Sequence, residues 1–201
     1  MMKVKNRFAD YDLVITVTDD TRVKYKDVFD MKQMYADMHD WLVEQEWTSS
    51  KDSDFKEIFY HHRWTQTGGE EVRFWWRMEK IPTQNKFYKW ELDINVLTVN
   101  LKRTEVVIDG KKFKAFTGEP EIKIFARMIA DYEHKWKNHW FLKHVRTLFF
   151  KRIFYKNMEM HRIELYREVY RFTEFMKTHF KLIRYRPEPE GEQFFTNKDF
   201  E

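Results

Sequence analysis

Residues 134–158 contain no acidic side chain, while basic and aromatic residues follow one another closely through the segment. Its centre, residues 145–156, is VRTLFFKRIFYK and holds four basic and four aromatic residues in twelve positions. Cations at this density can neutralise phosphates, and aromatic rings can stack on bases. The segment is therefore a candidate nucleic-acid-binding surface, for RNA rather than for sequence-specific DNA. Its candidate cations are Lys143, Arg146, Lys151, Arg152 and Lys156.

The same composition fits two other environments. A helix with Lys and Arg on one side and Trp and Phe on the other can lie in a lipid interface, so an anionic membrane surface is a second candidate partner. Alternatively, the aromatic rings pack on the protein's own sheet, while the basic side chains lie along its rim with their charges in water. The sequence leaves all three interpretations open.

A second combination of cations and rings lies in residues 71–80. Arg73 and Trp75 would share the polar face of a strand, where an aromatic ring and a cation can form a stacking platform for RNA. The glycines and paired aromatics of the RNP-type sequence are absent. A position beneath one of the C-terminal helices is therefore the expected one for Trp75.

Histidines offer no convincing metal site. His134, His139 and His144 are five residues apart, which places them on three different sides of a helix, whereas helical ligands need a spacing of three or four. The adjacent residues His61 and His62 would point to opposite faces of a strand. We expect no metal and no cofactor.

Candidate acid–base groups are few and explicable as surface charges. Asp37, His39 and Asp40 cluster locally, and Glu164 lies one helical turn from Glu168. No phosphate-binding glycine loop, serine elbow or kinase-like set occurs. We predict no catalytic residues, and an enzyme only if the fold brings His39, Asp40 or Glu164 into one pocket with other polar groups.

Charge is distributed unevenly along the chain. The formal net charge is +4, but residues 188–201 contain five acids and one base, which leaves 36 basic and 28 acidic residues on the rest. A basic body favours anionic partners. The chain has no cysteine, no secretory leader pattern and no apolar run approaching the ~18 residues of a membrane span, so we expect a soluble, cytoplasmic protein without a transmembrane segment.

These side chains must be positioned by a sheet and its helices. Alternating apolar residues predict strands over residues 10–18, 55–65, 71–80, 87–101 and 122–129, and Asp109-Gly110 predicts a hairpin. A change of phase in the fourth strand predicts a β-bulge near Val96 and Leu97. Helical spacing from an N-cap at Asp27 predicts a covering helix that ends near Trp47.

From residue 137 to 185 no Pro or Gly interrupts a helical pattern, but its apolar stripe changes direction. One stripe runs through residues 141–149, and the second lies about 130° around the helix. The helix is therefore either broken near residues 155–158 or in contact with two partners. We predict that the first stripe packs on the sheet and that the second binds another subunit or a protein partner. The second stripe contains Leu165, Val169, Phe172, Met176 and Ile183.

Three short motifs give the chain a resemblance. Tyr25-Lys26-Asp27 begins a predicted helix, residues 161–171 read HRIELYREVYR, and residues 187–190 read PEPE. In these motifs the chain resembles uncharacterised proteins of small-genome archaea. The resemblance implies no activity.

Together these patterns predict an α+β fold: an antiparallel meander of about five or six strands, one covering helix, and one long or two consecutive C-terminal helices. Residues 1–186 would form a single domain and residues 187–201 an acidic, flexible tail. The leading functional hypothesis is a non-catalytic interaction or scaffold protein, which uses its amphipathic C-terminal helices to bind a partner or itself. Nucleic-acid binding and membrane-surface binding are the alternatives.

Overall fold

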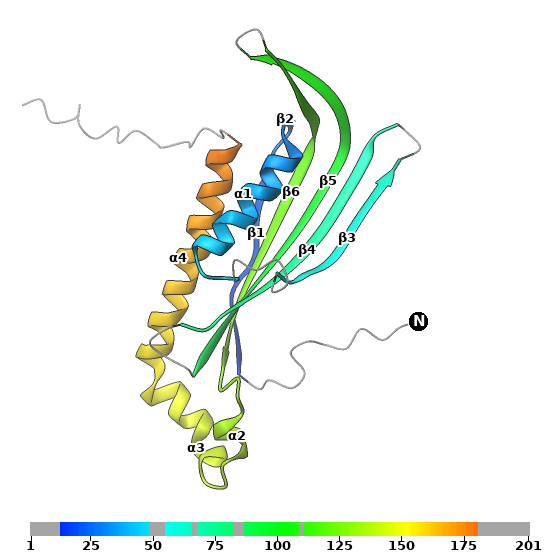
Figure 1. Ribbon diagram of the computed structural model, residues 1–201. Coiled ribbons are helices and arrows are strands. Elements are labelled where there is room, and N and C mark those ends of the chain that lie inside the picture. Colours follow the sequence, from blue (N-terminus) through cyan, green and yellow to red (C-terminus); the bar gives the residue numbers. More distant parts are fainter. Residues whose placement is uncertain (1–12, 49–54, 66–67, 83–86, 109–110, 181–201) are drawn as a thin grey trace, which may run out of the picture.

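The computed structural model describes residues 13–48, 55–65, 68–82, 87–108 and 111–180. They form an α+β fold in which one antiparallel six-stranded sheet carries two helices on the same face (Figure 1). The predicted fold class is therefore confirmed. The predicted acidic tail lies outside the described residues.

The last four strands follow one another as a meander, and the first strand pairs with the last one at the edge of the sheet. The order across the sheet is β1-β6-β5-β4-β3, and β2 pairs with β6. All neighbouring strands are antiparallel. The strands are β1 (Val14–Lys24), β2 (Asp27–Phe29), β3 (Glu57–Trp64), β4 (Glu70–Lys80), β5 (Tyr88–Ile108) and β6 (Lys111–Ala130). The helical elements are α1 (Met31–Glu44), α2 (Lys135–Asn138), α3 (Leu142–Leu148), a π-helical turn (Phe149–Ile153) and α4 (Tyr155–His179).

The core lies between the sheet and helices α1 and α4. Alternate residues of the central strands, such as Phe74, Trp76 and Ile94, are fully buried on the helix-bearing face, as the alternation predicts. The two helices meet over this face, where the rings of Trp41 in α1 and Phe172 in α4 lie 4.9 Å apart. Each large apolar side chain buried there contributes about 1.5–3 kcal/mol to folding.

Helix α1 begins after the short strand β2, and not at Asp27 as the sequence suggests. Asp27 belongs to β2, and the N-cap is Asp30, whose side chain accepts hydrogen bonds from the backbone N–H groups of Lys32 and Gln33. The predicted cap was wrong because residues 27–29 pair with β6 before the helix can start.

Strand β5 contains the expected irregularity, but further along the chain. The register between β5 and β6 shifts between Val99 and Lys102, where Asn100 has a φ of 54°. Thr98 is still buried on the helix-bearing face, so the phase of the strand has not changed at Leu97 as predicted. The predicted hairpin is confirmed by the pairing of Ile108 with Lys111, although Asp109 and Gly110 lie outside the described residues.

The C-terminal helical region is broken, which decides one alternative left open by the sequence. The π-helical turn ends at Phe154, which has φ −90° and ψ 6°, and α4 starts immediately after it. Helices α2 and α3 lie beyond the sheet, at the end of the molecule opposite the β5–β6 hairpin (Figure 1). Among the described C-terminal helices, it is therefore α4 that runs along the sheet.

The second apolar stripe does not have the role predicted for it. Leu165, Val169, Phe172 and Met176 are at most 2% exposed and belong to the chain's own core. This placement argues against an exposed partner-binding stripe, because these side chains already pack on the sheet and α1. Ile183 lies outside the described residues.

Candidate functional site

The most distinctive exposed surface is the helical tip, which we define as residues 134–156. Trp136 anchors it to the end of the sheet, because its ring lies 5.7 Å from that of Phe87 and 5.2 Å from that of Phe149. Asp131 fixes the start of α2: its two carboxylate oxygens accept hydrogen bonds of 3.0 Å from the backbone N–H groups of Trp136 and Lys137. Asp131 is itself buried.

The tip exposes large apolar side chains. Trp140 is 77% exposed, Leu148 61% and Ile153 66%, and three neighbouring rings are also exposed. These rings belong to Phe141, Phe154 and Tyr155. Single exposed apolar residues are common on soluble proteins, but a group in one short segment indicates an interaction site.

Cations accompany the apolar side chains. Lys143, Arg152 and Lys156 are exposed, and none of the three forms an ion pair with another described residue. The side chains of the other two predicted cations, Arg146 and Lys151, lie outside the described part of the structure. The tip thus joins exposed apolar groups to positive charge that no described acid neutralises.

The other predicted nucleic-acid residues lie on a different surface. Arg73 and Trp75 are on β4 and alternate with the buried core residues Phe74 and Trp76, so they lie on the opposite face of the sheet. The expectation that a C-terminal helix covers Trp75 was wrong: its ring stacks on Phe59 at 4.4 Å instead. Arg73 forms an ion pair with Glu71, which also binds Arg63, so this cation is already neutralised.

The histidines and carboxylates of the sequence take separate structural roles. His139 accepts hydrogen bonds at Nδ1 from the backbone N–H groups of Phe141 (3.3 Å) and Leu142 (3.4 Å), which starts α3. Asp37 contacts His179 at 2.7 Å, so it does not act together with His39. Across the described ranges, no three His, Asp or Glu side chains are grouped as metal ligands would be.

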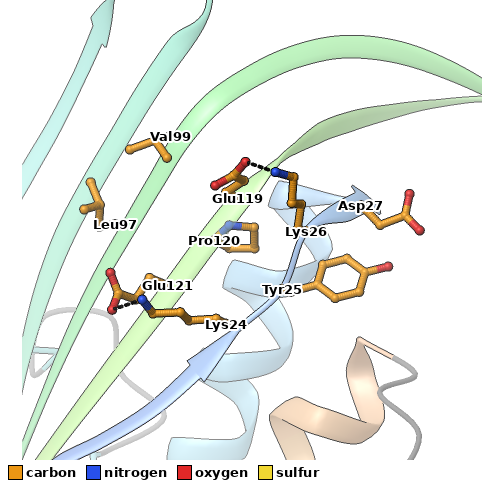
Figure 2. Close-up of a pocket in the computed structure, with 9 residues that line it drawn as sticks. All are labelled: Lys24, Tyr25, Lys26, Asp27, Leu97, Val99, Glu119, Pro120 and Glu121. Carbon is orange, nitrogen blue, oxygen red and sulfur yellow. Dashed lines mark ion pairs between the residues drawn. The ribbon is translucent and has the colours of Figure 1, made fainter.

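Two cavities lie on the sheet, and most of the charged side chains that line them are paired with one another. One of 440 Å³ lies beside the link from β1 to β2 (Figure 2). Its lysines are paired, Lys24 with Glu121 at 3.3 Å and Lys26 with Glu119 at 2.8 Å, which leaves little net charge to select a ligand. A second cavity of 400 Å³ lies beside the edge strand β3 and is mostly apolar, with buried Glu70 held by His62 at 2.8 Å.

Glu164 lies in one pocket with other polar groups, which is the arrangement that the sequence analysis required for an enzyme. It lines a third cavity, between α4 and the sheet, together with Lys80, His161 and Glu168. The sequence showed the spacing of Glu164 and Glu168 but not their neighbours, since Lys80 is contributed by a distant strand.

Comparison with known proteins adds no relative. No family model matches the chain, nor does any curated protein or solved structure. Among the helices that the structure describes, none combines the length and apolar content required to cross a bilayer. The function must therefore be inferred from the chain's own surfaces.

Proposed function

We propose that this protein is a non-catalytic interaction protein whose helical tip binds an anionic membrane surface. The observation that carries the proposal is the exposure of Trp140, Leu148 and Ile153 beside cations that no described acid neutralises. This is the membrane-surface alternative drawn from the sequence; the leading hypothesis, in which the Leu165 stripe binds a partner or a second copy, loses its surface because that stripe is buried.

The chemistry of a lipid interface matches both kinds of side chain. Trp, Leu and Ile gain about 1–2 kcal/mol each when most of their exposed area leaves water. Each Lys or Arg near an anionic leaflet contributes about 1 kcal/mol. Three apolar residues and three cations therefore supply roughly 6–9 kcal/mol. The cost of orienting the protein is subtracted from this sum, so the dissociation constant is near the micromolar range at the tightest.

Nucleic acid explains only part of the surface. Phosphates would pair with Lys143, Arg152 and Lys156, and Trp140 could stack on a base. Exposed aliphatic side chains at Leu148 and Ile153 gain nothing from base stacking, whereas a bilayer accepts them. The membrane proposal therefore accounts for more of the exposed residues than the RNA alternative does.

The test is co-sedimentation of the purified protein with vesicles of phosphatidylglycerol and phosphatidylcholine, compared with pure phosphatidylcholine. Binding is expected to the anionic vesicles and to weaken as salt is added. Leu148→Ala with Ile153→Ala should reduce binding about tenfold or more, since roughly 2 kcal/mol of apolar transfer is lost. The matched control is Ile58→Ala with Ile81→Ala, which removes two exposed isoleucines outside the tip and should bind like the wild type.

Charge is tested separately. Replacing Lys143, Arg152 and Lys156 with Gln should reduce binding to anionic vesicles, while the same change at the exposed residues Lys32, Lys102 and Lys114 should have a smaller effect. Equal binding to neutral vesicles, or equal loss in both triple variants, would contradict the proposal. Fluorescence anisotropy with mixed-sequence RNA across a salt series is the competing arm. Tight, tip-dependent RNA binding without vesicle binding would replace the membrane proposal with the nucleic-acid one.

A further inference from the structure

The cavity between α4 and the sheet, which we name the α4 pocket, has a volume of 430 Å³. Helix α4 contributes His161, Glu164, Glu168 and Arg171, whose spacings of three, four and three place them along one side of the helix. The strands contribute Lys80 and Trp90. The volume suits a small organic molecule rather than a single ion.

Most of the charges in the α4 pocket already have partners. Lys80 donates hydrogen bonds of 2.9 Å to Glu168 and to the backbone carbonyl of Gln45. His161 lies 2.9 Å from Glu164. Lys80 therefore neutralises Glu168, while Glu164 shares a hydrogen bond with the His161 imidazole.

Two arginines remain. Arg167 and Arg171 line the pocket, are exposed, and form no ion pair within the described part of the chain. One exposed carboxylate, Glu46, lies at the same pocket without pairing to them. Carboxylates and phosphates are the groups that pair with a guanidinium, so a ligand that uses Arg167 and Arg171 is an anion.

Buried polar atoms without hydrogen-bond partners gather at the same place. The indole Nε1 of Trp90, which is 4% exposed, and Oε2 of Glu168 are both unpartnered and belong to residues that line the pocket. Nε1 of Trp47 is also unpartnered, and its ring lies 6.4 Å from that of Trp90. Buried donors almost always have an acceptor, so the two indole N–H groups mark a place where another molecule can supply one; Oε2 of Glu168 is an acceptor and requires a donor instead.

Tyr88 extends this polar region beneath His161. Its ring lies 5.1 Å from the imidazole, and its buried hydroxyl has no partner. Burial raises the pKa of Tyr88 to about 12, so the hydroxyl keeps its proton at neutral pH and is a further donor.

We infer that the α4 pocket binds a small organic anion, whose carboxylate or phosphate group pairs with Arg167 and Arg171 and accepts a hydrogen bond from the Trp90 indole. The site is separate from the helical tip and does not depend on membrane binding. It assigns a role to the HRIELYREVYR motif, because His161, Glu164, Arg167, Glu168 and Arg171 all belong to that motif and all line the pocket.

Nuclear magnetic resonance of the indole N–H groups tests the inference directly. The full-length protein labelled with ¹⁵N is titrated with glycerol 3-phosphate, with succinate, and with uncharged glycerol, and Trp90→Phe assigns the Trp90 signal. One or both anions should shift that signal saturably, and glycerol should not. The anion that saturates distinguishes a phosphate site from a carboxylate site.

Arginine variants separate a built site from a general charge effect. Arg167→Gln with Arg171→Gln should weaken binding about tenfold or more, because the charge-assisted hydrogen bonds of both guanidinium groups are lost. Arg162→Gln on the same helix is the matched control, because Arg162 pairs with Glu159 and does not line the pocket. The remaining indole signals report whether each variant is folded. No saturable shift with either anion, or the same affinity in the double variant, overturns the inference.

Discussion

Removing the side chain of Asp131 should detach the helical tip while leaving the sheet intact. Asp131 is buried, and its carboxylate accepts the backbone N–H groups of Trp136 and Lys137, both at 3.0 Å. Hydrogen bonds to a charged group contribute roughly 1.5–3 kcal/mol each, and the freed N–H groups recover part of this by hydration. We therefore expect Asp131→Gly to destabilise the tip by about 2–3 kcal/mol. Glycine is chosen because the φ of residue 131 is 53°, which Ala would adopt only with added strain.

Hydrogen–deuterium exchange followed by mass spectrometry measures this effect locally. Peptides that cover residues 135–153 should lose protection in Asp131→Gly, and peptides from the central strands should not. Asp131→Asn retains one acceptor oxygen and should lie between the two. Unchanged protection in the tip would refute the capping role assigned to Asp131. A uniform loss across the sheet would show instead that the tip and the core unfold together.

Two further predictions concern the packing of the core and the loss of stability at low pH. Leu165→Ala should lower the free energy of unfolding by about 2–5 kcal/mol in urea denaturation, because Leu165 is 0% exposed. Ile163, which is 41% exposed, is the control, and Ile163→Ala should change this free energy by less than about 1 kcal/mol. Similar losses in the two variants would show that α4 is rotated about its axis. A hydrogen bond from Arg63, and a weaker effect of one from Arg73, lower the pKa of Glu71 below its ordinary 4.5. The ionised carboxylate therefore stabilises the fold above pH 4.5, and this stabilisation is lost as the pH falls through the lowered pKa. The difference in thermal midpoint between wild type and Glu71→Gln should therefore be largest at neutral pH and shrink below about pH 4.5, and a difference independent of pH would contradict the assigned ion pairs.

Local pattern was enough to predict most of the sheet. The alternation of Phe74, Trp76 and Met78 with charged neighbours identifies one buried face, because a strand turns successive side chains to opposite sides. The same logic does not say what covers a face. Trp75 was expected beneath a helix, but both α1 and α4 lie on the opposite face, and that choice depends on contacts between distant parts of the chain.

The sequence could predict only the residues that α4 contributes to the α4 pocket. The spacing of His161, Glu164, Glu168 and Arg171 places them on one side of a helix, and this could be worked out from helical periodicity alone. Their chemistry depends on Lys80 and Trp90, which come from strands that precede α4 by many residues. No local signal connects these residues, so the combination of paired carboxylates, unpaired arginines and buried indole emerges only in the folded chain.

The position of α3 explains why the tip is exposed. An amphipathic stripe states that a helix has an apolar side, but it does not state whether a surface is available to receive it. Strand β5 begins at Tyr88 and its neighbour β6 ends at Ala130, so both stop at the same end of the sheet, and among the described C-terminal helices it is α4 that runs back over that sheet. Helix α3 lies beyond that end, so Leu148 finds no strand to cover. An apolar stripe placed past the end of its own sheet stays exposed, and for this reason we assign the proposed membrane binding to the tip rather than to α4.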